Sequence, residues 1–347
     1  MSVKLKDIAR ASGVSISTVS RILNKDTSRK SSDETCRRVL EIAREMGYEA
    51  GDKEPAPVPG EGRDSRPLSV ACVLTSDFES FASPFFSTLL AGIQAELGRM
   101  GDRLSYNFFV MSIKDPGFSQ LVQATRLDCG IMLGRTSLEN INLLRERIPN
   151  LVYAGVNDIG NDLDEVLCDG YKGAARAVRH LVGLGHRRIG FIGPTQQKYQ
   201  VFNEHRYQGF LDEMAASGFE VDQELVQDTI LTAADGYESM SALIGRGALP
   251  TALFCANDTV ALGAMRALGE RGIAVPGDIS VVGFDDIETA SFVKPALTTI
   301  AIPTRELGRL AVKLMLDRLE TGRGYPVRVY LPFKLVERES CRAIDRG

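Results

Sequence analysis

The stretch TALFCANDTVALGAMRALGERGIAVPGDISVVGFDD, residues 251–286, contains a complete strand–helix–strand unit. Its first and last segments, TALFCAND and ISVVGFDD, are short apolar runs that end in Asn or Asp, while the middle segment has helical periodicity and ends at a glycine. Nearly continuous apolar residues in short strands indicate burial on both faces, which is typical of a parallel sheet covered by helices. The unit therefore predicts an α/β fold.

The same alternation of strands and helices runs through most of the chain from Leu68 onward. Further strands are predicted at 68–75, 105–112, 129–134, 150–156 and 187–194, and further helices at 83–101, 140–148, 173–185 and 205–218. About 270 residues of this pattern are more than one sheet usually holds. We therefore predict a core, residues 68–340, of two lobes that each contain a doubly wound parallel sheet, with a ligand cleft between them. Lobe 1 is expected to span about 68–168 and 300–328, and lobe 2 about 169–299 and 329–340.

The segment EAGDKEPAPVPGEGRDSRP, residues 49–67, separates this core from a small N-terminal domain, residues 1–48. It is rich in proline and glycine. The three prolines within 51–60 remove backbone donors and clash with a preceding helical turn, so no regular helix can run through them. We predict an extended, flexible linker.

The N-terminal domain has the pattern of a helix-turn-helix. In DIARASGVSISTVSRILN, residues 7–24, two short apolar-periodic segments meet across a Gly-Val turn, and residues 31–48 supply a third helix. On the second helix Ser17 and Arg21 lie opposite the apolar positions, with Asn24 nearby. Small or flexible hydrogen-bonding side chains of this kind suit insertion into the major groove of DNA.

Charge is unevenly distributed along the chain, whose net charge is −4. Residues 1–50 hold ten Lys and Arg against seven Asp and Glu, whereas the remaining residues hold 31 against 38. Contact with nucleic acid is therefore expected to belong to the N-terminal domain.

The sequence lacks motifs for catalysis, metal binding and membrane insertion. It has no phosphate-binding G-x-x-x-x-G-K-[ST] loop and no G-x-S-x-G nucleophile motif, and its three histidines leave little capacity for acid–base catalysis. The six cysteines lie far apart without a Cys–His cluster, so we expect a protein that is not an enzyme, without metal or cofactor, in a reducing compartment. No export signal and no apolar run of about 18 residues occurs, so we expect a cytoplasmic protein without membrane contact.

Polar side chains follow several of the predicted core strands. Three groups stand where a strand ends: Asn257-Asp258, Asp285-Asp286 and Thr75-Ser76-Asp77. In open α/β sheets the carboxyl ends of the strands face the ligand crevice, where short amide, carboxylate and hydroxyl groups can bind sugar hydroxyls. The alternative is that these residues cap the following helices. We favour capping for Asp258 and ligand contact for Asp285.

Several independent motifs resemble those of one protein family. The stretch LKDIARASGVSISTVSRILN, followed by ETCRRVLEIAREMGY, resembles the DNA-binding domain of the LacI/GalR family of bacterial transcriptional repressors. Core motifs match the same family in order and spacing: SPFF (83–86), LGHRRIGFIG (184–193), HRYQGF (205–210), residues 256–286 and PALTTI (295–300). The resemblance runs from about Leu5 to about Glu337. It implies a periplasmic-binding-protein-like core, a homodimer that binds a pseudo-palindromic operator, and a small effector between the lobes.

The resemblance implies that the second helix of the head contacts DNA. It assigns base edges to Ile16, Ser17 and Arg21, and phosphates to Thr18, Ser20 and Asn24. Arg21 is the best candidate for a bidentate contact with guanine. The hinge helix of the family carries a leucine that enters the minor groove, whereas residues 49–67 contain no leucine. We therefore expect neither this wedge nor the usual kink of the operator.

The resemblance also implies a set of effector contacts in the core. They are Asp77, Phe78, Arg206, Asn257 and Asp285. Carboxylates combined with an arginine and an asparagine favour a neutral sugar. Residues 284–300 and 330–340 resemble the branch of the family that controls an evolved β-galactosidase, so we expect a galactoside or another β-linked disaccharide. The alternatives are a purine- or nucleoside-responsive repressor, in which phenylalanines stack on the base, and a sugar-binding transport-type module, which would lack the DNA-binding head.

Overall fold

The computed structural model describes two compact units of the chain, residues 1–64 and 65–347, each with a hydrophobic core of its own. The described residues are 5–15, 18–19, 22, 32–46, 67–75, 83–101, 105–134, 137–160, 163–195 and 204–344. The expected linker, residues 49–67, lies outside them except for Pro67.

The first unit contains the helices α1 (Leu5–Ser12) and α3 (Asp33–Glu45). Their apolar faces meet in a small buried core formed by Ile8, Ala9, Val19, Val39 and Ala43. Gly13 follows α1 with a φ of 70°, a left-handed conformation that glycine adopts without strain, and it turns the chain out of the helix. Thr18 and Val19 are helical, as a helix-turn-helix requires.

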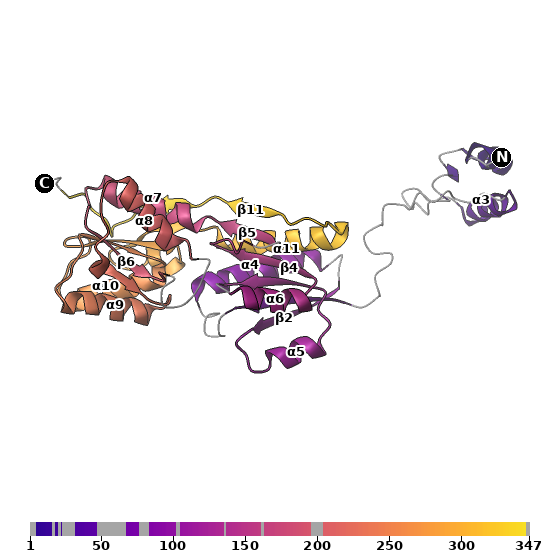
Figure 1. The fold of residues 1–347 in the computed structure, drawn as a ribbon. Helices are drawn as coiled ribbons and strands as arrows, with labels where there is room; N and C mark the ends of the chain where they lie inside the picture. The colour runs from indigo at the N-terminus through magenta and orange to yellow at the C-terminus, as the bar shows by residue number, and fades with distance from the viewer. Residues whose placement is uncertain are drawn as a thin grey trace. The chain divides into compact units, whose positions relative to one another are not determined.

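The second unit is built on two six-stranded sheets (Figure 1). The sheet of lobe 1 contains, from edge to edge, β11 (Arg328–Leu331), β5 (Asp164–Cys168), β4 (Asn150–Gly155), β3 (Cys129–Leu133), β1 (Leu68–Leu74) and β2 (Tyr106–Ser112), paired in parallel. The sheet of lobe 2 contains β12 (Lys334–Val336), β10 (Thr298–Ala301), β9 (Ser280–Asp285), β8 (Ala252–Cys255), β6 (Ile189–Gly193) and β7 (Val226–Asp228). β12 is antiparallel to β10, and the other neighbours are parallel. The prediction of an α/β core with two parallel sheets is confirmed.

Helices cover both faces of each sheet. In lobe 1, α4 (Pro84–Met100) and α11 (Thr304–Thr321) pack on one face, and α5 (Phe118–Ala124) and α6 (Leu138–Arg147) pack on the other. In lobe 2, α7 (Gly170–Gly183) and α8 (Arg206–Ala216) lie across the sheet from α9 (Ala233–Gly245) and α10 (Asp258–Glu270), as Figure 1 shows. Successive residues of β6 serve the two faces: Phe191 packs with the α7–α8 side and Ile192 with the α9–α10 side. Two short 3₁₀ helices complete lobe 2, Gln223–Leu225 and Glu288–Ser291.

The chain passes from one lobe to the other after β5, after β10 and after β11. The boundaries expected at about 300 and 328 fall a few residues later. β10 belongs to lobe 2 because Thr299 lies opposite Gly283 of β9, and β11 belongs to lobe 1 because Val329 lies opposite Val166 of β5. The second segment of lobe 1 therefore consists of α11 and β11.

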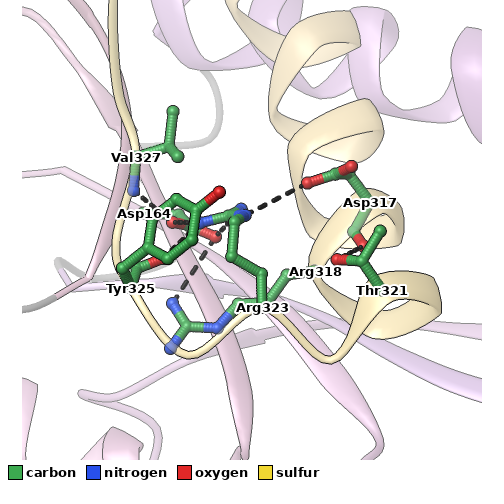
Figure 2. A network of polar contacts seen from close by, with 7 residues as sticks. All are labelled: Asp164, Asp317, Arg318, Thr321, Arg323, Tyr325 and Val327. Carbon is green, nitrogen blue, oxygen red and sulfur yellow. Dashed lines mark hydrogen bonds and ion pairs between the residues drawn. The ribbon is translucent and has the colours of Figure 1, made fainter.

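A buried polar network fixes the turn between α11 and β11 (Figure 2). Asp164, at the start of β5, accepts two hydrogen bonds of 2.9 Å from the guanidinium of Arg323. Its Oδ1 also accepts the N–H of Val327 at 2.7 Å, and Nη1 of Arg318 lies 3.5 Å from its Oδ2. Nε of Arg323 donates to Asp317 at 3.2 Å. Two arginines from one end of α11 and the turn beyond it thus converge on one carboxylate of the sheet.

Candidate functional site

Arg206, the first residue of α8, is held by a carboxylate two residues before it. Its Nε donates to Oε1 of Glu204 at 2.8 Å, and its Nη2 donates to Oε2 at 2.7 Å. Its Nη1 donates at 2.6 Å to the carbonyl oxygen of Ala256, the first residue after β8. The side chain of Arg206 is 3% exposed and that of Glu204 is 0% exposed. Its described partners therefore hold the guanidinium in one orientation.

Asp285 ends β9 in a strained backbone conformation. Its φ is 110° and that of Asp286 is 57°, both in a region that residues other than glycine rarely adopt. Such strain persists only where the surrounding structure enforces it, and it is concentrated at functional sites. Asp286 turns away and accepts a 2.6 Å hydrogen bond from Arg338. Asp285 is buried; burial raises its pKa well above the usual value, Arg206 opposes this effect, and Asp258 and Glu204 add to it.

Asn257 has the capping role that we expected of Asp258. Asn257 caps α10, since its Oδ1 accepts the N–H of Val260 at 2.8 Å. The prediction that Asp258 is the cap is wrong, because this residue already has its place inside α10 and points into the protein. Its Oδ2 accepts the N–H of Ile287 at 2.8 Å, and its Oδ1 accepts the hydroxyl of Thr299 at 2.6 Å. Burial raises the pKa of Asp258 to about 7.

Lobe 1 contributes Asn157, which follows β4 and is buried. Its Oδ1 accepts the backbone N–H of His205, beside Arg206, at 3.3 Å. A Cβ atom placed on Gly170 would lie 2.4 Å from Oδ1 of Asn157 and 3.4 Å from Cγ of Arg206. Glycine at this position therefore allows the first turn of α7 to approach both side chains closely.

These residues bring hydrogen-bonding groups of both kinds to the carboxyl ends of the lobe 2 strands. Arg206 supplies N–H donors, and Asp285 supplies carboxylate acceptors. The guanidinium carbon of Arg206 also lies 5.5 Å from the centre of the buried Phe284 ring, so the arginine packs against an aromatic side chain of the core. Donors and acceptors together match the needs of a small polar ligand.

Three of the five predicted effector contacts are described, and the structure brings them close together. Asp285 interacts electrostatically with Arg206, which donates to the residue before Asn257. Asp77 and Phe78 lie outside the described residues. Glu204 and Asn157 were missed; the rule that ligand sites lie at strand ends could have found Asn157, because it lies two residues after the end of β4.

Most of the predicted DNA contacts fall outside the described residues. This applies to Ile16, Ser17, Ser20, Arg21 and Asn24. Thr18 is described and half-buried. Its backbone N–H donates to Oγ of Ser15 at 3.2 Å, and the two hydroxyl oxygens lie 2.8 Å apart. Ser15 thus caps the start of the second helix.

Within the described part of the chain, no helix is both long and apolar enough to span a membrane. The same residues contain no group of three His, Cys, Asp or Glu side chains placed to hold a metal ion.

Two family models match separate parts of the chain. The model described as bacterial regulatory proteins, lacI family, matches residues 4–50, and the periplasmic binding protein-like domain matches residues 178–341. The chain is 32% identical over 343 residues to the HTH-type transcriptional repressor MelR of Bacillus subtilis (strain 168), covering 98% of this chain and 97% of that protein. It is 29% identical over 350 residues to the HTH-type transcriptional repressor PurR of Mannheimia succiniciproducens, covering 98% and 99%.

Two solved structures of transcriptional regulators resemble this chain over nearly its whole length. The transcriptional regulator CelR in complex with cellobiose has a TM-score of 0.71 at 28% identity, covering 97% of this chain and 99% of that one. The lac repressor dimer bound to operator and the anti-inducer ONPF has a TM-score of 0.69 at 26% identity, covering 99% and 100%.

Proposed function

Because the chain belongs to the LacI family of bacterial transcriptional repressors, we propose that it represses a carbohydrate-utilisation operon in the bacterial cytoplasm, under control of a small neutral sugar. That it is a DNA-binding regulator with a ligand-binding core, and not an enzyme, follows from the family. The observation that carries the finer proposal is the convergence of Arg206 and Asp285 on one end of lobe 2.

The chemistry of this end of lobe 2 supports a sugar. The Asp285 carboxylate can accept from two hydroxyl groups, and Arg206 can donate to others, so a polyhydroxylated molecule would satisfy both. CelR, a structural neighbour, was solved with cellobiose. We propose a galactoside or another β-linked disaccharide, bound by Arg206, Asn257 and Asp285 together with Asp77 and Phe78.

A purine or nucleoside effector is the second candidate. It is favoured by the similarity to PurR. A base would need an aromatic surface to stack on, for which the sequence offers Phe78, Phe81, Phe85 and Phe86; of these, Phe85 and Phe86 are among the described residues. Their rings lie edge to face with centroids 5.3 Å apart, and both pack against the core of lobe 1. This packing role leaves them less suited to stacking on a ligand and favours the sugar.

For the head, we propose that Arg21 reads a guanine, that Ile16 and Ser17 also face bases, and that Thr18, Ser20 and Asn24 approach phosphates. The support is the helix-turn-helix geometry around Gly13 and the small core that holds its helices. Because the linker 49–67 lacks a leucine, we propose that it does not wedge open the operator.

We propose that the protein acts as a homodimer through lobe 2. A groove of about 610 Å³ lies between α10 and the segment near 293–295. Its apolar lining is formed by Leu262, Met265, Ile273, Val275 and Val293. Phe292 beside it is 77% exposed, which is unusual for so large an apolar side chain. A second copy would cover this surface, as expected for a repressor whose relative was solved as an operator-bound dimer.

The test is DNA binding by the full-length protein. DNA selected from a random pool by the protein itself provides an operator, and fluorescence anisotropy measures its affinity with cellobiose, lactose, ribose, hypoxanthine or guanine present. A neutral sugar should change operator affinity at least about tenfold, which corresponds to about 1.4 kcal/mol of coupling. Asp285→Ala should remove this response while leaving operator binding without ligand intact. A response to the purines alone would establish the second candidate instead.

A further inference from the structure

The guanidinium of Arg206 is already paired where it reaches the effector site. Glu204 accepts from Nε and Nη2 at 2.8 and 2.7 Å, and its Oε1 also accepts the backbone N–H of Arg206 at 3.1 Å. Both side chains are buried, so water screens their attraction little. Glu204 therefore occupies the edge of the guanidinium, formed by Nε and Nη2, that matches two oxygens of a carboxylate or a phosphate.

A second carboxylate shares the same arginine. Asp285 interacts electrostatically with Arg206, Glu204 and Asp258. Among the described residues of this cluster, two acidic side chains, Glu204 and Asp285, thus interact with one guanidinium. An anionic ligand would therefore find the positive charge of Arg206 already compensated by Glu204.

We propose that Glu204 is a specificity-determining residue: it neutralises Arg206, so that the effector site accepts uncharged polyhydroxylated ligands and rejects phosphorylated or carboxylated ones. The inference rests on the proposed function only in that the effector binds beside Arg206 and Asp285.

An uncharged ligand can still use this arginine. A guanidinium has five N–H groups, and the described contacts with Glu204 and Ala256 use one each on Nε, Nη1 and Nη2. The second N–H of each Nη remains to donate to hydroxyl oxygens, while Asp285 accepts from hydroxyl hydrogens. A sugar phosphate would meet these remaining N–H groups on a guanidinium whose charge Glu204 already compensates, so its own charge would lose water without gaining an unpaired cation.

The experiment measures binding of inorganic phosphate to the full-length protein, by calorimetry and by thermal unfolding, with ionic strength held constant with chloride. Wild type should show no phosphate binding that depends on Arg206. Glu204→Gln keeps the shape of the side chain but frees the positive charge, and it should bind phosphate at least about tenfold more tightly than wild type. Adding Arg206→Ala to Glu204→Gln should abolish the gain, which separates this site from basic residues of the DNA-binding head.

A matched control is Glu213→Gln on α8, which removes the carboxylate that pairs with the exposed Arg179 of α7. It removes the same charge and should leave phosphate binding at the wild-type level. If Glu204→Gln is destabilised, phosphate should raise its unfolding temperature selectively, because the anion replaces the lost carboxylate.

Wild-type phosphate binding that disappears in Arg206→Ala would overturn the inference, and so would a folded Glu204→Gln variant that gains none. If Glu204→Gln does not fold even with phosphate, the comparison of wild type with Arg206→Ala decides alone. The inference is supported if phosphate has no effect on wild type, or if its effect on wild type is retained in Arg206→Ala. The assay uses neither DNA nor sugar. A failure of the sugar-responsive repressor proposal therefore appears in the anisotropy experiment and leaves this result unaffected.

Discussion

Replacing Asp164 by asparagine should destabilise lobe 1 by about 3–5 kcal/mol, the usual cost of removing one partner from a buried ion pair. Asp164 is 0% exposed, and its partners Arg323 and Arg318 are 7% and 20% exposed. Asparagine keeps the shape of the side chain and can still accept the N–H of Val327. The change therefore removes the charge with little loss of packing.

The contacts of the two arginines place the expected loss near the lower end of this range. Arg323 keeps Asp317, to which its Nε donates at 3.2 Å, and the carbonyl oxygen of Tyr325 (Figure 2). Arg318 lies 3.5 Å from Asp164 and is partly exposed, so it can turn toward water. The main cost is that Arg323 loses its buried carboxylate and keeps only that of the half-exposed Asp317, and we expect a loss of about 3 kcal/mol.

Urea unfolding followed by circular dichroism, at fixed protein concentration, measures this loss. Glu146→Gln is the matched control, because it removes one carboxylate charge from an exposed position on α6 in the same lobe. Its free energy of unfolding should equal that of wild type. In a double-mutant cycle with Arg323→Gln, the two losses should overlap strongly, since both break the same pair. A loss below about 1 kcal/mol for Asp164→Asn, which is typical of exposed ion pairs, would refute the reasoning.

Four further predictions concern the site, the head and the linker. Burial raises the pKa of Asp258 to about 7, so between about pH 4 and pH 7 the folded protein holds a proton that the unfolded chain releases. The free energy of unfolding that this group contributes should therefore fall as pH rises from about 4 to about 7. Urea unfolding of Asp258→Asn should show a smaller change of the free energy of unfolding with pH. Asp285→Ala should weaken effector binding by about 1.5–3 kcal/mol in calorimetry, and unchanged affinity would exclude it as a contact. Arg21→Ala should cost about 1–3 kcal/mol on operator in anisotropy titrations and less on random DNA, whereas equal losses would mean a phosphate contact. Because the linker 49–67 has no leucine to insert into the minor groove, the bound operator should be less bent than one that such a leucine kinks. A strong bend at the operator centre in a gel-phasing assay would contradict this.

The alternation of strands and helices was enough to predict the fold of the core. Residues 251–286 were expected to form strand, helix and strand, and they form β8, α10 and β9. The signal was clear because each strand is buried on both faces and reads as a continuous apolar run. β11 carried no such signal, since it is an edge strand with partly exposed residues, and its pairing with β5 depends on chain segments far apart in the sequence.

The candidate site was predictable in its location but not in its internal pairing. Asn and Asp cap helices about equally well, so the sequence could not decide between the adjacent Asn257 and Asp258. The extended backbone of Asn257, with φ −151° and ψ 169°, decides it by aiming that side chain at the helix start. Glu204 gave no signal either, because residues two apart on a helix do not face each other. It reaches Arg206 because it precedes α8 and is not helical.

The residues proposed to hold the effector also adjoin hydrogen bonds that connect the lobes. Arg206 follows His205, whose N–H donates to Asn157 in lobe 1. The carbonyl oxygen of Asp285 accepts the N–H of Ile302 at 3.3 Å, in the passage from β10 to α11. A ligand shifts a conformational equilibrium only by the difference between its affinities for the two states. We expect a sugar that engages Arg206 and Asp285 to have that difference available, because a movement of one lobe against the other would strain the hydrogen bonds beside these two residues.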